Sequence, residues 1–106
     1  MEIAIVLTTI GADTDAEALG RTLVDEGLAA CVNVLPPMTS VYRWKSKVEV
    51  EREHQMVIKT TRAGLAALEQ RLLDLHPYEL PEFIVLTAAA GTAYGQWLNE
   101  GVRVDT

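Results

Sequence analysis

Apolar and polar positions follow one another along the chain in blocks that predict strands and helices in turn. Residues 3–9 form a nearly continuous apolar stretch rich in β-branched side chains, which is typical of a central strand buried on both faces. A second strand is predicted to begin near Leu28, to be interrupted at Pro36 and Pro37, and to resume over residues 40–44. After a polar turn at residues 45–47, a third strand is predicted over residues 48–60 and a fourth over residues 82–88.

The third predicted strand has a regular alternation that assigns its side chains to two faces. The residues predicted to share one face are Glu49, Glu51, Glu53 and Lys59, and those predicted to share the other are Val48, Val50, Arg52, His54, Met56 and Ile58. We therefore expect a row of carboxylates along one face, and a packing role for His54 on the other.

Three helices are predicted from apolar residues spaced three and four positions apart. The first is predicted to start with a capping box of Thr14 and Glu17 and to stop at Gly27. The second spans residues 62–75 before Pro77, and the last spans residues 92–100 with Thr92 as its cap. The predicted apolar stripes are Ala16, Leu19, Leu23 and Val24 in the first helix and Leu65, Leu68, Leu72 and Leu75 in the second.

The predicted order of elements is β-α-β-β-α-β followed by a terminal helix. Two right-handed βαβ halves joined in this way give a four-stranded antiparallel sheet with both helices on one face. The sequence therefore predicts an α+β, ferredoxin-like plait with a C-terminal helix. Its 106 residues fit a single domain, residues 1–106, with no linker or low-complexity segment.

The hairpin between the second and third predicted strands is longer than the small plait can cover. Typical strands hold about five or six residues, whereas these arms extend well beyond that. The tip also carries apolar and aromatic side chains, among them Val41, Tyr42 and Trp44, which a lone ribbon would expose to water. We expect the hairpin to dock on other copies of the chain, because closed cyclic symmetry removes exposed strand edges. The pattern itself does not fix the number of copies.

Composition narrows the functional classes. The net charge is −6, from 15 acidic and 9 basic residues, which argues against nucleic-acid binding because phosphate contacts need clustered Lys and Arg. An acidic balance is compatible with attracting cations and equally with ordinary solubility. No apolar run approaches the roughly 18 residues of a membrane span, and the start lacks a basic signal region. With Cys31 as the sole cysteine, we expect a cytoplasmic protein.

Specific motifs resemble those of the CutA family. They cover nearly the whole chain in the family's order: Leu28-Ala-Ala-Cys-Val-Asn33, Ser40-x-Tyr42-x-Trp44, Ile58-Lys-Thr60, His76-Pro-Tyr78, Pro81-Glu82 and Tyr94-x-x-Trp97. The resemblance implies a ferredoxin-like homotrimer whose long hairpins pair across subunits, similar to PII-like signalling proteins. It also implies an association with copper and other divalent cations.

The chain departs from the family pattern in two places. Ser46 stands where the hairpin turn of the family commonly has glycine, so a turn with positive φ would be slightly strained. Some bacterial relatives proposed to bind copper carry extra cysteines at positions that correspond here to Thr8 and Arg71. This chain alone therefore lacks the thiols for a thiolate-rich copper(I) site.

Three residues are candidate ligands for a divalent metal ion such as copper or zinc. His76, at a helix end before proline, is the first choice, and Glu79 or Glu82 in the following loop can lie near it. Cys31 is a soft ligand, although a lone cysteine on an apolar strand is more often a core residue. The alternatives are a capping or interface hydrogen bond for His76, and a solvated strand face for the row Glu49, Glu51 and Glu53, which would otherwise hold hard cations.

Other residues are predicted to line the interface or cleft between subunits: Tyr42, Trp44, Lys59, Tyr78, Tyr94 and Trp97. Lys59 is expected either to attract an anion or to pair with a glutamate such as Glu82. No nucleophile–base pair, phosphate loop or dinucleotide fingerprint is legible, so we expect no enzyme activity.

Three functions are compatible with these observations. The first is a trimeric divalent-cation tolerance protein that binds metal ions weakly at His76, with Cys31 and Glu82. The second is a PII-like module that holds a metabolite or protein partner in clefts lined by two chains, through residues such as Cys31, Lys59, Tyr78 and Glu82. The third is a structural trimer that acts indirectly.

Overall fold

The computed structural model describes residues 1–103 of the chain. The predicted order of elements is confirmed, with the interrupted second strand present as two strands. The elements are β1 (Glu2–Gly11), α1 (Ala16–Asp25), β2 (Cys31–Val34), β3 (Met38–Trp44), β4 (Lys47–Thr60), α2 (Leu65–Leu75), β5 (Ile84–Ala89) and α3 (Thr92–Gly101). Among the described residues, no helix is long and apolar enough to span a membrane.

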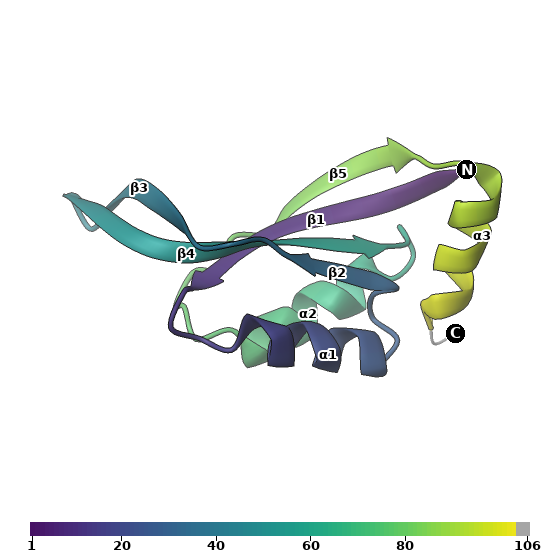
Figure 1. Ribbon diagram of the computed structural model, residues 1–106, viewed down its shortest axis with the longest axis horizontal. Coiled ribbons are helices and arrows are strands. Elements are labelled where there is room, and N and C mark those ends of the chain that lie inside the picture. The colour runs from purple at the N-terminus through teal and green to yellow at the C-terminus, as the bar shows by residue number, and fades with distance from the viewer. Residues whose placement is uncertain (104–106) are drawn as a thin grey trace.

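The sheet has the order β2-β4-β1-β5, and every pair of neighbours is antiparallel. Both α1 and α2 lie against the same face, while α3 sits at the end of the sheet beside the N-terminus (Figure 1). The predicted ferredoxin-like plait is therefore confirmed. β3 pairs only with β4 and projects with it beyond the body of the molecule as a long hairpin.

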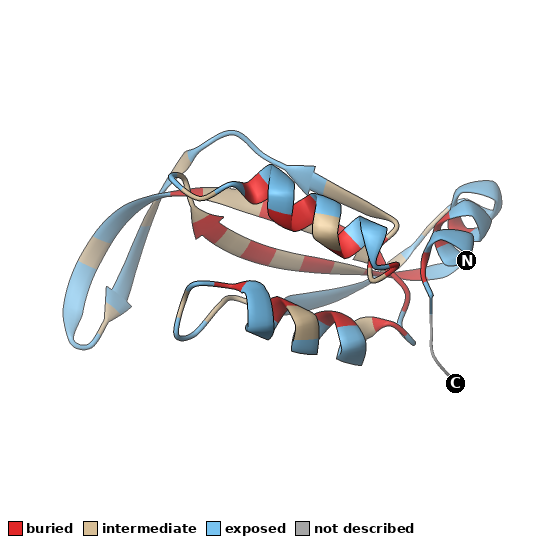
Figure 2. Cartoon of the chain, turned by 90° about the horizontal axis from the view of Figure 1, so that it is seen from below, coloured by how far each residue is buried: buried red, intermediate tan, exposed pale blue. Residues whose placement is uncertain are grey.

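The core lies between the sheet and the two helices that cover it. Its fully buried members include Val6, Leu23, Ile58 and Leu68, and the buried positions of α1 and α2 face the sheet (Figure 2). β1 was predicted to be buried on both faces, but in the single chain its buried side chains are those that face α1 and α2, together with Ile3, which packs against Leu98 of α3 on the other face. We call the other face, which α3 covers only at one end, the open face.

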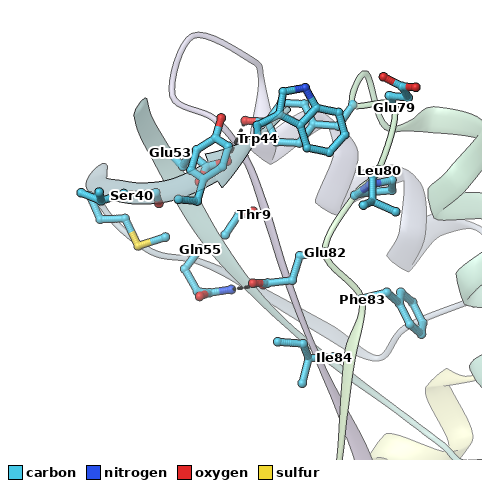
Figure 3. Close-up of a pocket in the computed structure, with 15 residues that line it drawn as sticks. Thr9, Ser40, Trp44, Glu53, Gln55, Glu79, Leu80, Glu82, Phe83 and Ile84 are labelled. Atoms are coloured by element: carbon cyan, nitrogen blue, oxygen red, sulfur yellow. Dashed lines mark hydrogen bonds between the residues drawn. The ribbon is translucent and has the colours of Figure 1, made fainter. Parts of the chain in front are cut away.

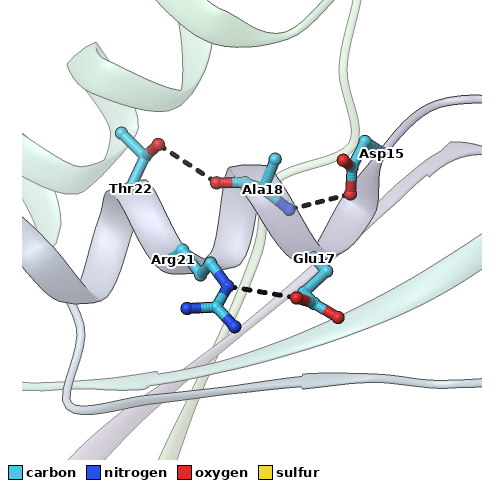
Figure 4. Close-up of polar contacts among 5 residues, drawn as sticks. All are labelled: Asp15, Glu17, Ala18, Arg21 and Thr22. Carbon is cyan, nitrogen blue, oxygen red and sulfur yellow. Dashed lines mark hydrogen bonds and ion pairs between the residues drawn. The ribbon is translucent and has the colours of Figure 1, made fainter.

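The N-cap of helix α1 lies one residue later than predicted. Asp15, not Thr14, is the N-cap, and its carboxylate accepts a 3.0 Å hydrogen bond from the Ala18 amide (Figure 4). The Thr14–Glu17 capping box does not form, because the Glu17 carboxylate binds Arg21 at 3.0 Å. The predicted stop at Gly27 is confirmed by its φ of 72°.

Other boundaries differ from the prediction for local reasons. α2 begins at Leu65 rather than residue 62, because the Thr61 hydroxyl accepts from the Gly64 amide in a turn that precedes the helix. The predicted cap of α3 is wrong: Thr92 is its first helical residue, and Gly91 is the N-cap with no side-chain hydrogen bond. The apolar stripe of α1 was also drawn too wide, since Val24 is 40% exposed.

The hairpin turn consists of two residues with positive φ, Lys45 at 49° and Ser46 at 68°. Such a turn matches the twist of the flanking strands, but left-handed φ values favour Gly and Asn. The expected strain at Ser46 is therefore present. The cross-strand register places Tyr42 opposite Glu49 and Met38 opposite Glu53, so the aromatic and acidic side chains share one face of the hairpin.

Candidate functional site

A cleft of about 790 Å³ opens between the hairpin and the segment 78–84 that follows α2. Its charged lining residues are Glu53, Glu79 and Glu82, and no Lys, Arg or His among the described residues lines it. Its aromatic lining residues are Tyr42, Trp44, Tyr78 and Phe83 (Figure 3). We refer to this site as the acidic cleft.

Glu53 is the most enclosed charged group of the acidic cleft. Glu53 is only 5% exposed. The solvated strand face that was one alternative for Glu49, Glu51 and Glu53 therefore does not describe Glu53. The hydroxyl of Tyr78 donates a 2.7 Å hydrogen bond to Oε2 of Glu53. This bond ties the segment after α2 to β4 and closes one end of the cleft.

His76 also holds the segment that follows α2 in place. Its Nε2 lies 2.7 Å from the carbonyl oxygen of Thr9, which can only accept, so Nε2 carries the proton. Nδ1 then accepts from the Tyr78 amide at 3.1 Å. His76 is 7% exposed, and both ring nitrogens are occupied by hydrogen bonds. Within one chain, His76 therefore makes the capping hydrogen bonds that were the alternative to metal binding.

Gln55 connects β1 to Glu82 inside the cleft. Its side-chain amide donates both to the Thr8 carbonyl, at 2.7 Å, and to Oε2 of Glu82, at 3.2 Å. Figure 3 shows Gln55 and Glu82 pointing toward each other across the cleft. Glu82 is half-buried, and a neutral amide rather than a cation satisfies its carboxylate.

The field in the acidic cleft is negative. Burial raises the pKa of the Tyr78 hydroxyl above its ordinary value of 10, and its hydrogen bond to Glu53 adds to the rise. The pKa of Tyr42 is raised as well, first by burial and then by the charges of Glu51, Glu53 and Glu49. Both phenols therefore stay protonated and neutral at neutral pH, so the negative charge of the cleft comes from its carboxylates.

The other predicted interface residues gather on the open face near α3. Cys31 pairs with Lys59 across β2 and β4, and it is half-buried with a free thiol. The Lys59 ammonium lies 5.9 Å from the ring centre of Tyr94, whose ring packs at a tilt against that of Trp97 with 5.4 Å between ring centres. Within residues 1–103, Lys59 forms no ion pair with Glu82.

The structure thus divides the predicted site into two groups. Lys59 follows Gln55 by four residues on β4, which at about 3.3 Å per residue separates the two ends by about 13 Å. Tyr78 and Glu82 line the acidic cleft and His76 contacts Tyr78 behind it, while Cys31 and Lys59 lie at the α3 end. Among the described residues, no three His, Cys, Asp or Glu side chains are close enough to hold a metal ion.

The two positions that carry cysteines in some relatives have structural roles here. Arg71 makes two hydrogen bonds to Glu26, of 2.8 and 2.9 Å, and this contact lowers the pKa of Glu26. Thr8 is fully buried, and its hydroxyl has no hydrogen-bond partner among the described residues.

Sequence reasoning missed two features of the acidic cleft. Gln55 was not singled out, although its spacing from Glu51 and Glu53 on β4 already put it on the same face of the strand. The enclosure of Glu53 was also missed, because it depends on the loop with Tyr78 folding back over β4. The pattern of β4 gives no signal for that contact.

Comparisons with known proteins give a consistent result. A family model described as CutA1 divalent ion tolerance protein matches residues 4–101. The divalent-cation tolerance protein CutA of Thermus thermophilus is 40% identical over 97 residues, which cover 91% of this chain and 94% of that protein. The protein of the same name from Citrobacter koseri is 42% identical over 103 residues, covering 96% and 90%.

Solved structures agree with the sequence relatives. The divalent cation tolerance protein of Thermus thermophilus superimposes with a TM-score of 0.89 at 39% identity, covering 97% of this chain and 100% of that one. The PII-like protein CutA from Nostoc, in apo form, has a TM-score of 0.89 at 35% identity and covers 96% and 99%.

Proposed function

The chain belongs to the CutA1 family of divalent ion tolerance proteins, and from this premise we propose that it is a homotrimer that binds divalent cations where its copies meet. Copper and zinc are the cations that its candidate ligands suit best. The observation that carries the proposal is the incompleteness of the single chain: acidic and soft ligands are present on the surface that faces away from the helices, but no three of them converge within the described residues.

Assembly is supported by the open face. Ile84 and Leu86 of the edge strand β5 are 45% and 47% exposed, and Trp97 of α3 is 51% exposed. β5 pairs only with β1, so its other edge is free within the described chain. A contiguous apolar face beside an unpaired strand edge favours association with another copy. Three copies related by a closed rotation would cover it.

The proposed ligands are His76, Glu82 and Cys31, brought together from different copies. Glu82 needs the least rearrangement, because it exchanges one neutral hydrogen bond from Gln55 for the metal. His76 would bind through Nδ1 after releasing the Tyr78 amide. Cys31 must come from another subunit, since it lies at the opposite end of the sheet from His76. Three ligands of these types suit copper(II) or zinc.

Calorimetric titration with Cu²⁺ and Zn²⁺ tests this function. We expect saturable binding to the wild type, and affinity at least about tenfold lower in Glu82→Gln and in His76→Ala. Glu69→Gln, which removes an exposed carboxylate of α2, is the matched control and should keep the wild-type affinity. Negligible heats in the wild type, or equal affinities in all four proteins, would remove the proposed metal site.

A second candidate function is a PII-like binding module. The acidic cleft supports it, because its volume of about 790 Å³ falls in the usual range of small-molecule sites, about 300–1,000 Å³. The Nostoc relative is itself described as PII-like. In this reading, neighbouring copies add Cys31 and Lys59 to the cleft residues Tyr78 and Glu82. A thermal-shift screen with metabolites and metal ions separates the two functions, because only a ligand that binds the folded state raises the melting temperature.

A further inference from the structure

We propose that the acidic cleft binds a small organic cation, an alkylguanidinium or alkylammonium group, with its charge at Glu53 and its alkyl part against the aromatic walls. This site uses Glu53, Tyr42 and Trp44, none of which belongs to the proposed metal ligands. It therefore stands or falls separately from the metal-binding function.

The charge of Glu53 is not balanced by a cation within the described chain. The side chain is 5% exposed and lines the cleft, yet within residues 1–103 no Lys, Arg or His forms an ion pair with it. Its one hydrogen-bond donor, the Tyr78 hydroxyl, is neutral and reaches only Oε2. A buried carboxylate is costly unless a cation and further donors accompany it. A guanidinium supplies both the charge and parallel N–H donors.

The rim of the cleft already holds a cation of this class. The ammonium of Lys45 lies 5.7 Å from the ring centre of Trp44 and 3.8 Å from Oε2 of Glu79. An aromatic face and a carboxylate thus share one ammonium group at the surface, where both charged side chains are more than 70% exposed. The half-buried Tyr78, which contacts Glu53, and the more exposed Tyr42 also line the cleft, so a cation at Glu53 would lie beside aromatic side chains.

The mixed lining of the cleft favours an organic cation over a bare metal ion. The lining combines carboxylates with apolar side chains such as Met38, Leu80 and Phe83. A hydrated divalent ion gains nothing from apolar walls and needs several oxygen ligands, and no such group of three converges in the described chain. An alkyl chain that carries one positive end fits both parts of the lining.

Calorimetry with n-butylguanidinium chloride at constant ionic strength tests the proposal, with n-butylurea as the uncharged analogue. We expect saturable binding of n-butylguanidinium to the wild-type protein and no binding of n-butylurea at the same concentrations. Glu53→Gln retains an oxygen that can accept from Tyr78, and it should weaken binding at least about tenfold. Tyr42→Leu leaves the charge in place and should weaken binding several-fold through the lost aromatic wall.

The controls decide between this site and its rivals. Glu69→Gln removes a carboxylate outside the cleft and should leave the affinity unchanged. Equal binding of n-butylurea, no binding to the wild type, or an unchanged affinity in Glu53→Gln would overturn the proposal. If binding appears only in Arg43→Ala, the cleft is filled by that hairpin arginine from a second copy, which also overturns it. Metal titration of Glu53→Gln reports separately on the proposed function.

Discussion

The hydroxyl of Tyr78 donates a 2.7 Å hydrogen bond to the carboxylate of Glu53. The two residues are 25 positions apart, and the bond connects the segment after α2 to the middle of β4. The ring of Tyr78 also packs on His76, with 4.7 Å between ring centres. This contact gives the acidic cleft its shape, because it holds one wall against the strand that forms the other.

Removing the Tyr78 hydroxyl should destabilise the fold. Tyr78→Phe leaves a 5% exposed carboxylate without its donor, and a hydrogen bond to a charged group contributes about 1.5–3 kcal/mol. We expect the free energy of unfolding, measured by urea denaturation, to fall by that amount. Tyr94→Phe is the matched control, because its ring is 43% exposed and a surface change of this kind stays within about 0.5 kcal/mol. Equal effects of the two variants would contradict this role of Glu53.

The same residue predicts a loss of stability in alkaline solution. The pKa of Tyr78 is raised in the folded chain above its ordinary value of 10, by burial and by Glu53. The folded state therefore keeps this proton after the unfolded state has lost it, and stability falls as the pH rises above 10. Denaturation midpoints measured between pH 9 and about 11.5 should fall more steeply for the wild type than for Tyr78→Phe. Parallel curves would show that the Tyr78 proton is not linked to folding.

Two buried threonines should respond in opposite directions to the same substitution. Thr8 and Thr60 are both fully buried, but the Thr60 hydroxyl donates to the Leu28 carbonyl at 2.9 Å, whereas that of Thr8 has no partner in the described chain. Thr8→Val removes an unsatisfied polar atom and should raise the free energy of unfolding by about 1 kcal/mol. Thr60→Val should lower it by about 1–2 kcal/mol. Destabilisation by Thr8→Val would contradict the assignment of an unsatisfied hydroxyl at this position.

The hairpin turn offers a local gain in stability. Ser46 adopts a φ of 68°, and a left-handed conformation costs a non-glycine residue about 1–2 kcal/mol. Glycine removes most of this cost but adds entropy to the unfolded chain. We therefore expect Ser46→Gly to raise the free energy of unfolding by about 0.5–1 kcal/mol, as measured by denaturant titration. Ser40→Gly, within β3, should lower it.

The parts of the fold that depend on local pattern could be predicted from the sequence. The alternation in residues 48–60 correctly separated Met56 and Ile58 from Glu53 and Lys59, and Gly27 marked the end of α1. The cap of α1 was misplaced because Thr14, Asp15 and Asp13 are all good capping residues, and spacing alone does not choose among them.

The candidate site was less predictable because it depends on contacts between distant segments. Nothing in the sequence near His76 shows that Thr9 and Tyr78 occupy both of its ring nitrogens. The sequence placed Cys31 with His76 through a shared family resemblance, whereas the fold puts Cys31 beside Lys59 at one end of the sheet and His76 beside Thr9 at the other. Sequence identified residue types suited to cations, but only the loop path brings Tyr78 and Glu82 onto the hairpin.

In the proposed trimer, other copies of the chain cover the open face and complete the metal site. Leu86 and Val24 have similar exposures, 47% and 40%, but Leu86 lies on β5 and Val24 on the outer side of α1. Leu86→Glu should therefore prevent assembly, because it places a charge in the proposed interface. Val24→Glu should leave assembly intact, which makes it the matched control.

Sedimentation velocity at micromolar concentration tests this assembly. We expect the wild type and Val24→Glu to sediment as one species with three times the 11.6 kDa mass of the chain, and Leu86→Glu to sediment as a smaller one. A folded wild-type protein that sediments as a single 11.6 kDa chain would show that the open face is not an interface between copies.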